Sequence, residues 1–422
     1  MPTGLPRLPA ALSDRIPPIA VFSDEAFAAA LHDKSWDVPE LLARAELCLR
    51  MLDDAYRLLV DAEEAQAPSP EQVAQGLTRI QFFAAARLLA TRYVSPFDGQ
   101  DCTFETALAF VMDICRSARS ADGISVCLGM SFWKRRRIAE MLAAGGPAPL
   151  FAETAAEAVS TAVRKKGAVA VWAAREPGDL RGLAAAAGVP VVLIEDGFVR
   201  SVGLGADFMP AASIVLDRTG IYFDPTRPSG LDRILSGTEF TPELIERARR
   251  LIQSMVANGI TKYNVGSATL DIAAPPGRRV IFVPGQVEND RSVALGGGEI
   301  QRNLDLLKRV RALNADAYIV YKPHPDVDAG HRPGAISDVE TLKIADQLVR
   351  GISSAAIISA VDEVHTLTSL AGFEALIRDR YVVTYGCPFY AGWGLTKDFI
   401  SVPHRQRQLS LEQLVAGALI LS

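Results

Sequence analysis

From Gly123 onward, short apolar runs alternate with stretches of helical period, and this alternation limits the fold more than any other feature of the sequence. Alternating strands and helices are typical of βαβ units with a buried parallel sheet. We expect strands at 124–128, 168–172, 189–194 and 212–216, then at a run opening at Arg279, at 317–321, at 355–359 and at 381–384. Helices are expected at 138–144, 152–163, 242–257, 299–313 and 370–378. The pattern predicts an α/β protein with two Rossmann-like domains facing a cleft, although one large sheet is also compatible with it.

The domain boundaries follow from the same reading. Residues 1–121 form a helical region, 122–238 the first Rossmann-like domain and 239–407 the second, and a C-terminal helix at 408–422 can join the first. Within the helical region, Ser69-Pro70-Glu71 is a typical helix start, 103–119 is a helix and Tyr93–Gly99 is a turn.

Composition narrows the classes of partner and location. The 422 residues carry a net charge of −5, which disfavours a general nucleic-acid binder. The five cysteines show no C-x-x-C spacing and no cluster of metal-ligating residues is visible, so we expect no metal and a reducing cytosol. No stretch reaches the roughly 18 apolar residues of a membrane span. We therefore expect a cytoplasmic protein, at most peripheral on a membrane surface.

The stretch Glu195–Ser201 follows a short, continuous apolar run at 189–194, which is typical of a strand buried on both faces. Ligands of open α/β sheets bind beyond the carboxyl ends of the strands, so Glu195 and Asp196 are candidate reactive carboxylates. Arg200 and Ser201 follow them as candidate sugar contacts. The alternative is a surface turn in which an aspartate caps a helix.

Three segments of the second half have the residue types of a phosphate or nucleotide site. Lys322-Pro323-His324-Pro325 follows a strand, and its lysine and histidine can contact a phosphate. Thr368 and Ser369 stand before a helix that contains Gly372 and Glu374, where free amides favour anions and a carboxylate can accept bonds from ribose. Gln286 closes the first strand of this half and offers a polar contact. A structural turn at 322–325 and plain capping at 368–369 are the alternatives.

Two further segments are candidate sugar or acceptor contacts. Trp133-Lys134-Arg135 begins a basic run that could bind an acidic group, although most charge runs are solvated helix faces. Tyr390 and Trp393 lie in a loop rich in aromatics and glycines, which suits a sugar ring but also fits a packed loop.

Taken together and in this order, six segments resemble the bacterial capsule-polysaccharide β-Kdo transferases of the KpsC type. They are Trp133–Arg135, Glu195–Ser201, Val283–Asp290, Lys322–Pro325, His365–Leu376 and Tyr385–Thr396. The segment Arg92–Leu108 also resembles a family element, but one that follows a catalytic module there and precedes it here. Asn289 stands where an acidic residue is expected, and the family has two modules where this sequence has one.

The resemblance implies a GT-B-like fold and retaining transfer of Kdo from CMP-Kdo, with no cofactor, to a glycan or glycolipid of capsule or lipopolysaccharide. It implies Asp196 as the nucleophile of a covalent Kdo–enzyme intermediate, His324 and Ser369 as phosphate contacts, and Glu195 as the acid/base partner. Location at the inner membrane surface would fit a lipid-linked acceptor. A transferase of another CMP- or UDP-sugar and a non-catalytic scaffold of the glycan machinery are the competing hypotheses.

Overall fold

The computed structural model describes residues 5, 16–35, 37–59, 77–203 and 208–422. The helix start expected at Ser69 lies outside these residues. The chain divides into two compact units, Met1–Ile124 with Ile138–Pro149, and Ser125–Arg137 with Leu150–Ser422.

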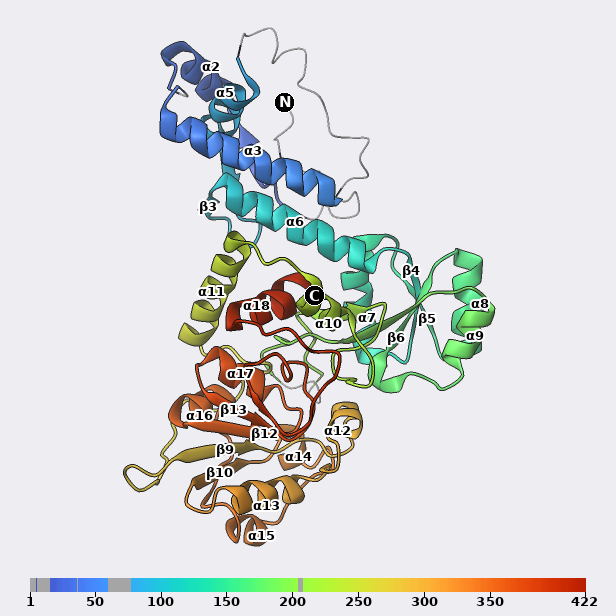
Figure 1. Ribbon diagram of the computed structural model, residues 1–422. Coiled ribbons are helices and arrows are strands. Elements are labelled where there is room, and N and C mark those ends of the chain that lie inside the picture. Colours follow the sequence, from blue (N-terminus) through green and yellow to red (C-terminus); the bar gives the residue numbers. More distant parts are fainter. Residues whose placement is uncertain (1–4, 6–15, 36, 60–76, 204–207) are drawn as a thin grey trace. The chain divides into compact units, whose positions relative to one another are not determined.

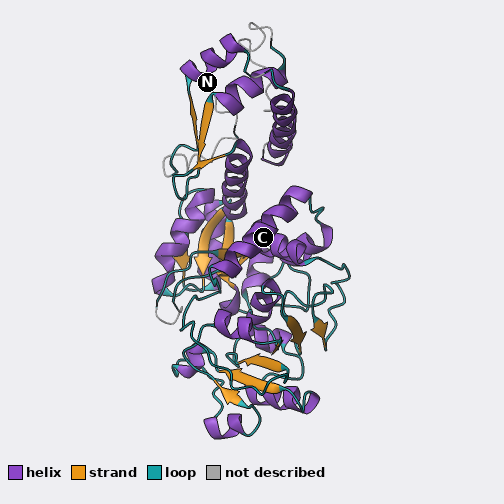
Figure 2. Cartoon of the chain, turned by 90° about the vertical axis from the view of Figure 1, so that its left-hand side faces the viewer, coloured by secondary structure: helices purple, strands orange, loops and turns teal. Residues whose placement is uncertain are grey.

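The first unit combines helices with a small antiparallel sheet, which the sequence analysis did not predict. The sheet has the order β1 (Ala20–Phe22), β2 (Thr91–Val94), β3 (Asp101–Cys102), and Figure 2 shows its strands in orange. Strand β2 takes in Tyr93, where a turn had been expected. The helices of this unit are α2 (Asp24–Asp33), α3 (Pro39–Leu59), α5 (Arg79–Phe83), η1 (Ala84–Leu89), α6 (Phe104–Ala121) and η2 (Ala143–Gly145). Thr103 caps α6 through its side chain, as its position before the apolar period predicts.

The second unit opens with a five-stranded sheet. Its order is β5 (Leu150–Ala152), β4 (Ile124–Leu128), β6 (Ala168–Trp172), β7 (Val191–Asp196), β8 (Ile214–Asp217). Strands β4 and β6 have the expected bounds, and β6 and β7 are parallel. Strand β8 runs antiparallel to β7, however, which the apolar pattern could not indicate because both orientations bury the same residues. The helices here are α8 (Ala155–Lys165), η3 (Ala173–Arg175), α9 (Leu180–Ala186), α10 (Gly230–Gly237) and α11 (Pro242–Ala257), together with the first half of α7 (Phe132–Leu142), whose second half belongs to the first unit.

A six-stranded parallel sheet follows. Its order is β11 (Gln347–Leu348), β10 (Tyr318–Lys322), β9 (Val280–Pro284), β12 (Glu363–Thr366), β13 (Tyr381–Thr384), β14 (Lys397–Asp398). The strand expected at 355–359 is instead helix α16 (Ser354–Ala360), capped by Ser353, and the strand is β12. A short apolar run does not distinguish a buried helix from a buried strand.

Helices cover both faces of this sheet (Figure 1). Val280 and Phe282 of β9 belong to the same core as α16 and α17 (Ala371–Ile377), whereas Ile281 and Val283 face the core of α13 (Asn303–Leu313). The remaining helices are α12 (Arg291–Gly296), α14 (Pro325–Asp328), α15 (Asp338–Leu342), α18 (Leu411–Val415) and η5 (Ala416–Leu421). The C-terminal η5 packs on α10. The two elements are so close that a Cβ at Gly417 would lie 2.4 Å from the side chain of Leu235.

One hydrophobic core runs through the second unit and includes residues of both sheets. Each of the two sheets forms a Rossmann-like lobe. The carboxyl ends of β7, β9, β10 and β12 contribute to one cavity. This is the GT-B-like arrangement that the sequence predicts.

Candidate functional site

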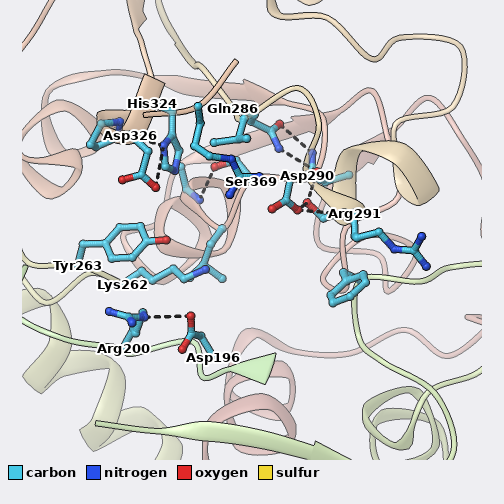
Figure 3. A pocket seen from close by; sticks show the side chains of 18 of the residues that line it. Asp196, Arg200, Lys262, Tyr263, Gln286, Asp290, Arg291, His324, Asp326 and Ser369 are labelled. Atoms are coloured by element: carbon cyan, nitrogen blue, oxygen red, sulfur yellow. Dashed lines mark hydrogen bonds and ion pairs between the residues drawn. The ribbon is translucent and has the colours of Figure 1, made fainter. Parts of the chain in front are cut away.

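A cavity of about 860 Å³ collects most of the candidate residues. From the first lobe it is lined by Trp133, Lys134, Glu195, Asp196 and Arg200, and from the second by Gln286, Lys322, His324, Pro325, Thr368, Ser369 and Glu374. Most of them lie at or just beyond the carboxyl ends of parallel strands, as expected for an α/β site. Figure 3 shows Asp196 and Arg200 across the cavity from His324 and Ser369.

Asp196, the last residue of β7, is held between two cations. The Nζ of Lys134 lies 3.2 Å from its Oδ2, and the Nε of Arg200 lies 3.0 Å from the same oxygen. The side chains of all three residues are at most 17% exposed. Two charge-assisted contacts in such a dry site fix the orientation of the carboxylate and balance its charge.

Lys134 owes its position to aromatic neighbours. Its ammonium lies 3.5 Å from the ring centroid of Trp172 and 5.4 Å from that of Trp133, within the range of cation–π contact. Burial lowers the pKa of Lys134 while the charge of Asp196 opposes the shift. Because the basic run lies in α7, its members diverge: Arg135 pairs with Glu153 and does not line the cavity, contrary to expectation.

Glu195 has an unusual ionisation. Burial, followed by the charge of Asp196, raises its pKa to about 7. Its Oε1 accepts a hydrogen bond of 3.1 Å from the backbone N–H of Asp196. A carboxyl group poised near neutrality can exchange a proton with a reacting hydroxyl.

His324 is a neutral hydrogen-bonding group rather than a cation. Its Nδ1 accepts a hydrogen bond of 3.2 Å from the backbone N–H of Asp326 and so caps α14. Burial, followed by the charges of Lys262 and Lys322, lowers the pKa of His324 to about 4. With Nδ1 used as an acceptor, the remaining ring proton sits on Nε2 and can be donated to an anion.

Gln286 organises the segment before α17. Its Nε2 donates to Thr368 Oγ1 at 2.8 Å, and its Oε1 accepts from the backbone N–H of Thr368 at 3.1 Å. The backbone of Gln286 is in turn held by Asn303, which accepts from its N–H at 2.8 Å and donates to its carbonyl at 2.7 Å. Gln286 thus positions Thr368 and the adjoining Ser369. The sequence analysis did not single out Asn303, because it lies in a helix and belongs to no recognised motif.

Glu374 was expected to bind ribose but holds protein backbone. Its Oε1 accepts a hydrogen bond of 2.8 Å from the N–H of Lys262, and burial raises its pKa. The side chain is 5% exposed and still borders the cavity.

Lys262 and Tyr263 are the main site residues that sequence reasoning missed. They lie in an irregular segment between α11 and β9, and both line the cavity (Figure 3). Burial works to lower the pKa of Lys262, but Tyr263, Tyr222 and the two carboxylates of β7 outweigh it and raise the pKa. In the sequence these two residues are only a lysine followed by a tyrosine in a loop, and no known motif marks such a pair as part of a site.

Four candidate contacts take structural positions instead. Tyr390 and Trp393 have no exposed surface, and their polar atoms donate to the carbonyls of Ser369 and Phe389. Gly372 leaves room for Tyr390, since a Cβ there would lie 2.2 Å from the tyrosine oxygen. Ser201 is buried and donates to the carbonyl of Gly203. None of the four lines the cavity, because the aromatic loop packs inward and presents Phe389 there instead.

Within the part of the chain that the structure describes, no three His, Cys, Asp or Glu side chains gather as a metal site would require. Within the same residues, every helix is too short or too polar to span a bilayer.

Comparison of the chain with known proteins identifies its family. A family model described as capsule polysaccharide biosynthesis protein matches residues 167–421. The capsule polysaccharide modification protein LipA of Neisseria meningitidis serogroup A is 40% identical over 369 residues, which are 87% of this chain and 51% of LipA. The lipopolysaccharide-processing protein LpsZ of Rhizobium meliloti is 38% identical over 75% of this chain and 73% of its own length. The chain thus spans about half the length of the LipA proteins.

Two solved structures of KpsC from Thermosulfurimonas dismutans have the same fold. The β Kdo 2,7 transferase is 37% identical with a TM-score of 0.56, covering 70% of this chain and 90% of its own. The β Kdo 2,4 transferase is 28% identical with a TM-score of 0.61, covering 71% and 91%. The KpsC-type resemblance is therefore confirmed. Because the family model covers more than half of the sequence and LipA matches 87% of it, the chain belongs to the capsule polysaccharide biosynthesis family.

Proposed function

We propose that the chain is a retaining glycosyltransferase that moves Kdo from CMP-Kdo to a glycan or glycolipid acceptor during the synthesis of a bacterial surface polysaccharide. The observation that carries this proposal is the position of Asp196, a carboxylate oriented by two cations and facing the phosphate-binding residue types of the other lobe. The likeness to two KpsC domains described as β Kdo transferases supports the choice of sugar.

In the first displacement, an oxygen of Asp196 attacks the anomeric carbon of Kdo. The bond from that carbon to the phosphate oxygen breaks, and CMP leaves with the electron pair. Lys322 and the Nε2–H of His324 are suited to stabilise the negative charge on the departing phosphate. The product of this step is a Kdo ester of Asp196.

In the second displacement, an acceptor hydroxyl attacks the same carbon and the ester bond to Asp196 breaks. Two inversions give net retention of the anomeric configuration. Glu195 is the proposed base for the hydroxyl proton. Ester formation removes the charge of Asp196, which is one cause of the raised pKa of Glu195, so Glu195 ionises more readily at the stage that needs a base.

The decisive experiment exposes Asp196→Asn and the wild-type protein to CMP-Kdo. We expect no Kdo transfer by the variant, and a wild-type adduct with the mass of one Kdo residue when acceptor is withheld. Glu153→Gln, an exposed carboxylate of the same lobe, is the matched control and should transfer normally. Undiminished turnover by Asp196→Asn would defeat the mechanism.

A thermal-shift panel of CMP, UMP, UDP and GDP tests the donor class, since a ligand that binds the native state raises the unfolding temperature. Stabilisation by CMP supports the proposal, whereas stabilisation by UDP alone would identify a UDP-sugar transferase. If no nucleotide stabilises the chain and Asp196→Asn has no effect in the cell, a scaffold role is favoured. A cytoplasmic location, peripheral to the inner membrane, forms part of the proposal because it would bring the protein to a lipid-linked acceptor.

A further inference from the structure

Positive charge exceeds negative charge around Asp196. Lys134 and Arg200 pair with it directly, and Lys262 interacts with it and with Glu195. Three cations therefore face two carboxyl groups, one of which, Glu195, has a pKa of about 7 and is only partly ionised at neutral pH. This imbalance favours a further anion beside Asp196.

Arg200 has unused hydrogen-bonding capacity at this point. It is 1% exposed, its Nε pairs with Asp196 and its Nη1 donates to Ser201 Oγ at 2.8 Å. Its Nη2 is buried and, within the described residues, has no hydrogen-bond partner, although the guanidinium lies 6.0 Å from the ring centroid of Trp133. An unpaired buried N–H of a cation is costly, so such a group in a cavity wall indicates a partner that arrives with the ligand.

Arg200 and Lys262 are fixed as neighbours by backbone bonds. The N–H groups of Arg200 and Ser201 both donate to the carbonyl of Lys262, at 3.0 and 3.2 Å. The N–H of Lys262 is held by Glu374 at 2.8 Å, so the segment is tied to both lobes. Figure 3 shows the two cationic side chains beside Asp196, on the same side of the cavity. They are preorganised to act on one ligand group.

The chemistry of the proposed donor identifies that group. A nucleophile must come within about 3–3.5 Å of the carbon it attacks. In Kdo a carboxylate is bonded directly to that carbon, so the reaction brings it close to Asp196, and two like charges at that distance repel strongly. A donor sugar without this carboxylate would not need extra cations there.

We propose that Arg200 and Lys262 together bind the carboxylate on the anomeric carbon of the donor sugar and thereby select a sugar acid. This inference rests on the proposed function. It assigns the phosphate to the other group of residues, Lys322 and His324, so the two anions of the donor have separate binding sites.

The test compares Lys262→Met with Lys322→Met. Both lysines line the cavity; Lys262 is partly buried and Lys322 is buried. For each protein we would measure the dissociation constant for CMP and the KM for CMP-Kdo generated in situ. Lys262→Met should raise the KM for CMP-Kdo by about 10- to 100-fold, the range for one charge-assisted bond, and leave CMP binding unchanged. Lys322→Met should weaken both. Unchanged CMP binding also shows that Lys262→Met is folded.

Arg200→Lys provides a second variant that keeps the charge but loses the planar fork, and should raise the KM for CMP-Kdo with normal CMP binding. An equal loss of CMP and CMP-Kdo affinity in Lys262→Met would mean that Lys262 binds phosphate, and no loss of either would remove it from the site. Either of these two results for Lys262→Met overturns the inference about the carboxylate. The proposed function would still stand as long as the wild-type protein transfers Kdo. Absence of Kdo transfer by the wild-type protein would overturn both.

Discussion

The carboxylate of Asp196 lies among charged side chains that affect one another's position and ionisation. Lys134 is held by two tryptophans, Arg200 by its own loop, and Glu195 responds to Asp196 through a raised pKa. The two ion pairs hold the carboxylate of Asp196 in one orientation, and the neighbouring carboxyl group of Glu195 has a pKa of about 7. A carboxyl group with a raised pKa beside a second carboxyl group is a common arrangement for acid/base chemistry.

The raised pKa of Glu195 predicts a pH dependence of stability. The folded state binds the Glu195 proton more tightly than the unfolded chain, whose reference pKa is 4.5. The resulting stabilisation is complete below pH 4.5 and is lost as the pH rises to about 7. Glu195→Gln lacks this contribution, so the unfolding temperature of the wild type should fall relative to that of the variant across this range.

The measurement is thermal unfolding at several pH values between about 3.5 and 8, roughly one unit beyond each pKa. Glu153→Gln, at an exposed surface position, is the control and should follow the wild-type profile. A constant difference between Glu195→Gln and the wild type at every pH would show that the pKa of Glu195 is not raised.

At the scale of elements, helix α17 and the aromatic loop after β13 fit together closely. Gly372 lies on α17 where a Cβ would meet Tyr390, and Tyr390 donates to the carbonyl of Ser369 just before the helix. This packing places Thr368 and Ser369 at the cavity. The loop therefore supports the site without touching a ligand through Tyr390 or Trp393.

Gly372→Ala should lower the unfolding temperature, because overpacking costs about 1–3 kcal/mol. Gly182→Ala is a matched control: Gly182 is also helical, in α9, but a Cβ there meets nothing within 4 Å. That change should stabilise the chain by about 0.5–1 kcal/mol through helix propensity. Differential scanning fluorimetry of the two variants measures the contrast, and a stabilising effect of Gly372→Ala would contradict the packing argument.

At the scale of the whole second unit, buried contacts join the two lobes around the cavity. Arg405 has a fully buried side chain and pairs with Asp232 of α10 at 2.8 Å. It also donates to the carbonyls of Pro388 and Ala391, in the loop that presents Phe389 to the cavity. One guanidinium thus connects the helix after the first sheet with a loop of the second.

Arg405→Met should destabilise this unit by about 3–5 kcal/mol, because it leaves the carboxylate of Asp232 buried without its cation. Arg407→Met is the control: Arg407 donates to carbonyls at the C-terminal end of α10 and, among the described residues, pairs with no carboxylate, so its loss should cost less. Urea unfolding followed by tryptophan fluorescence gives the comparison. Equal midpoints for Arg405→Met and the wild type would exclude the proposed connection.

The sequence by itself determined the alternation of strands and helices, the strand ends that carry Asp196 and His324, and the family. Local patterns were sufficient here because a buried strand is short and apolar and its polar successor must lie at the sheet edge. The bounds of β4, β6 and β13 followed directly from their apolar runs.

Only the tertiary structure decided which polar and aromatic residues meet. The run at 354–360 is a helix, β8 reverses direction, Tyr390 and Trp393 turn into the core, and Lys262 enters the site from an irregular segment. Apart from the serine cap at the start of the helix, these outcomes have no local signature, because they depend on contacts between segments far apart in the chain. The position of Lys262, for example, is set by hydrogen bonds to Arg200 and to Glu374, 112 residues away.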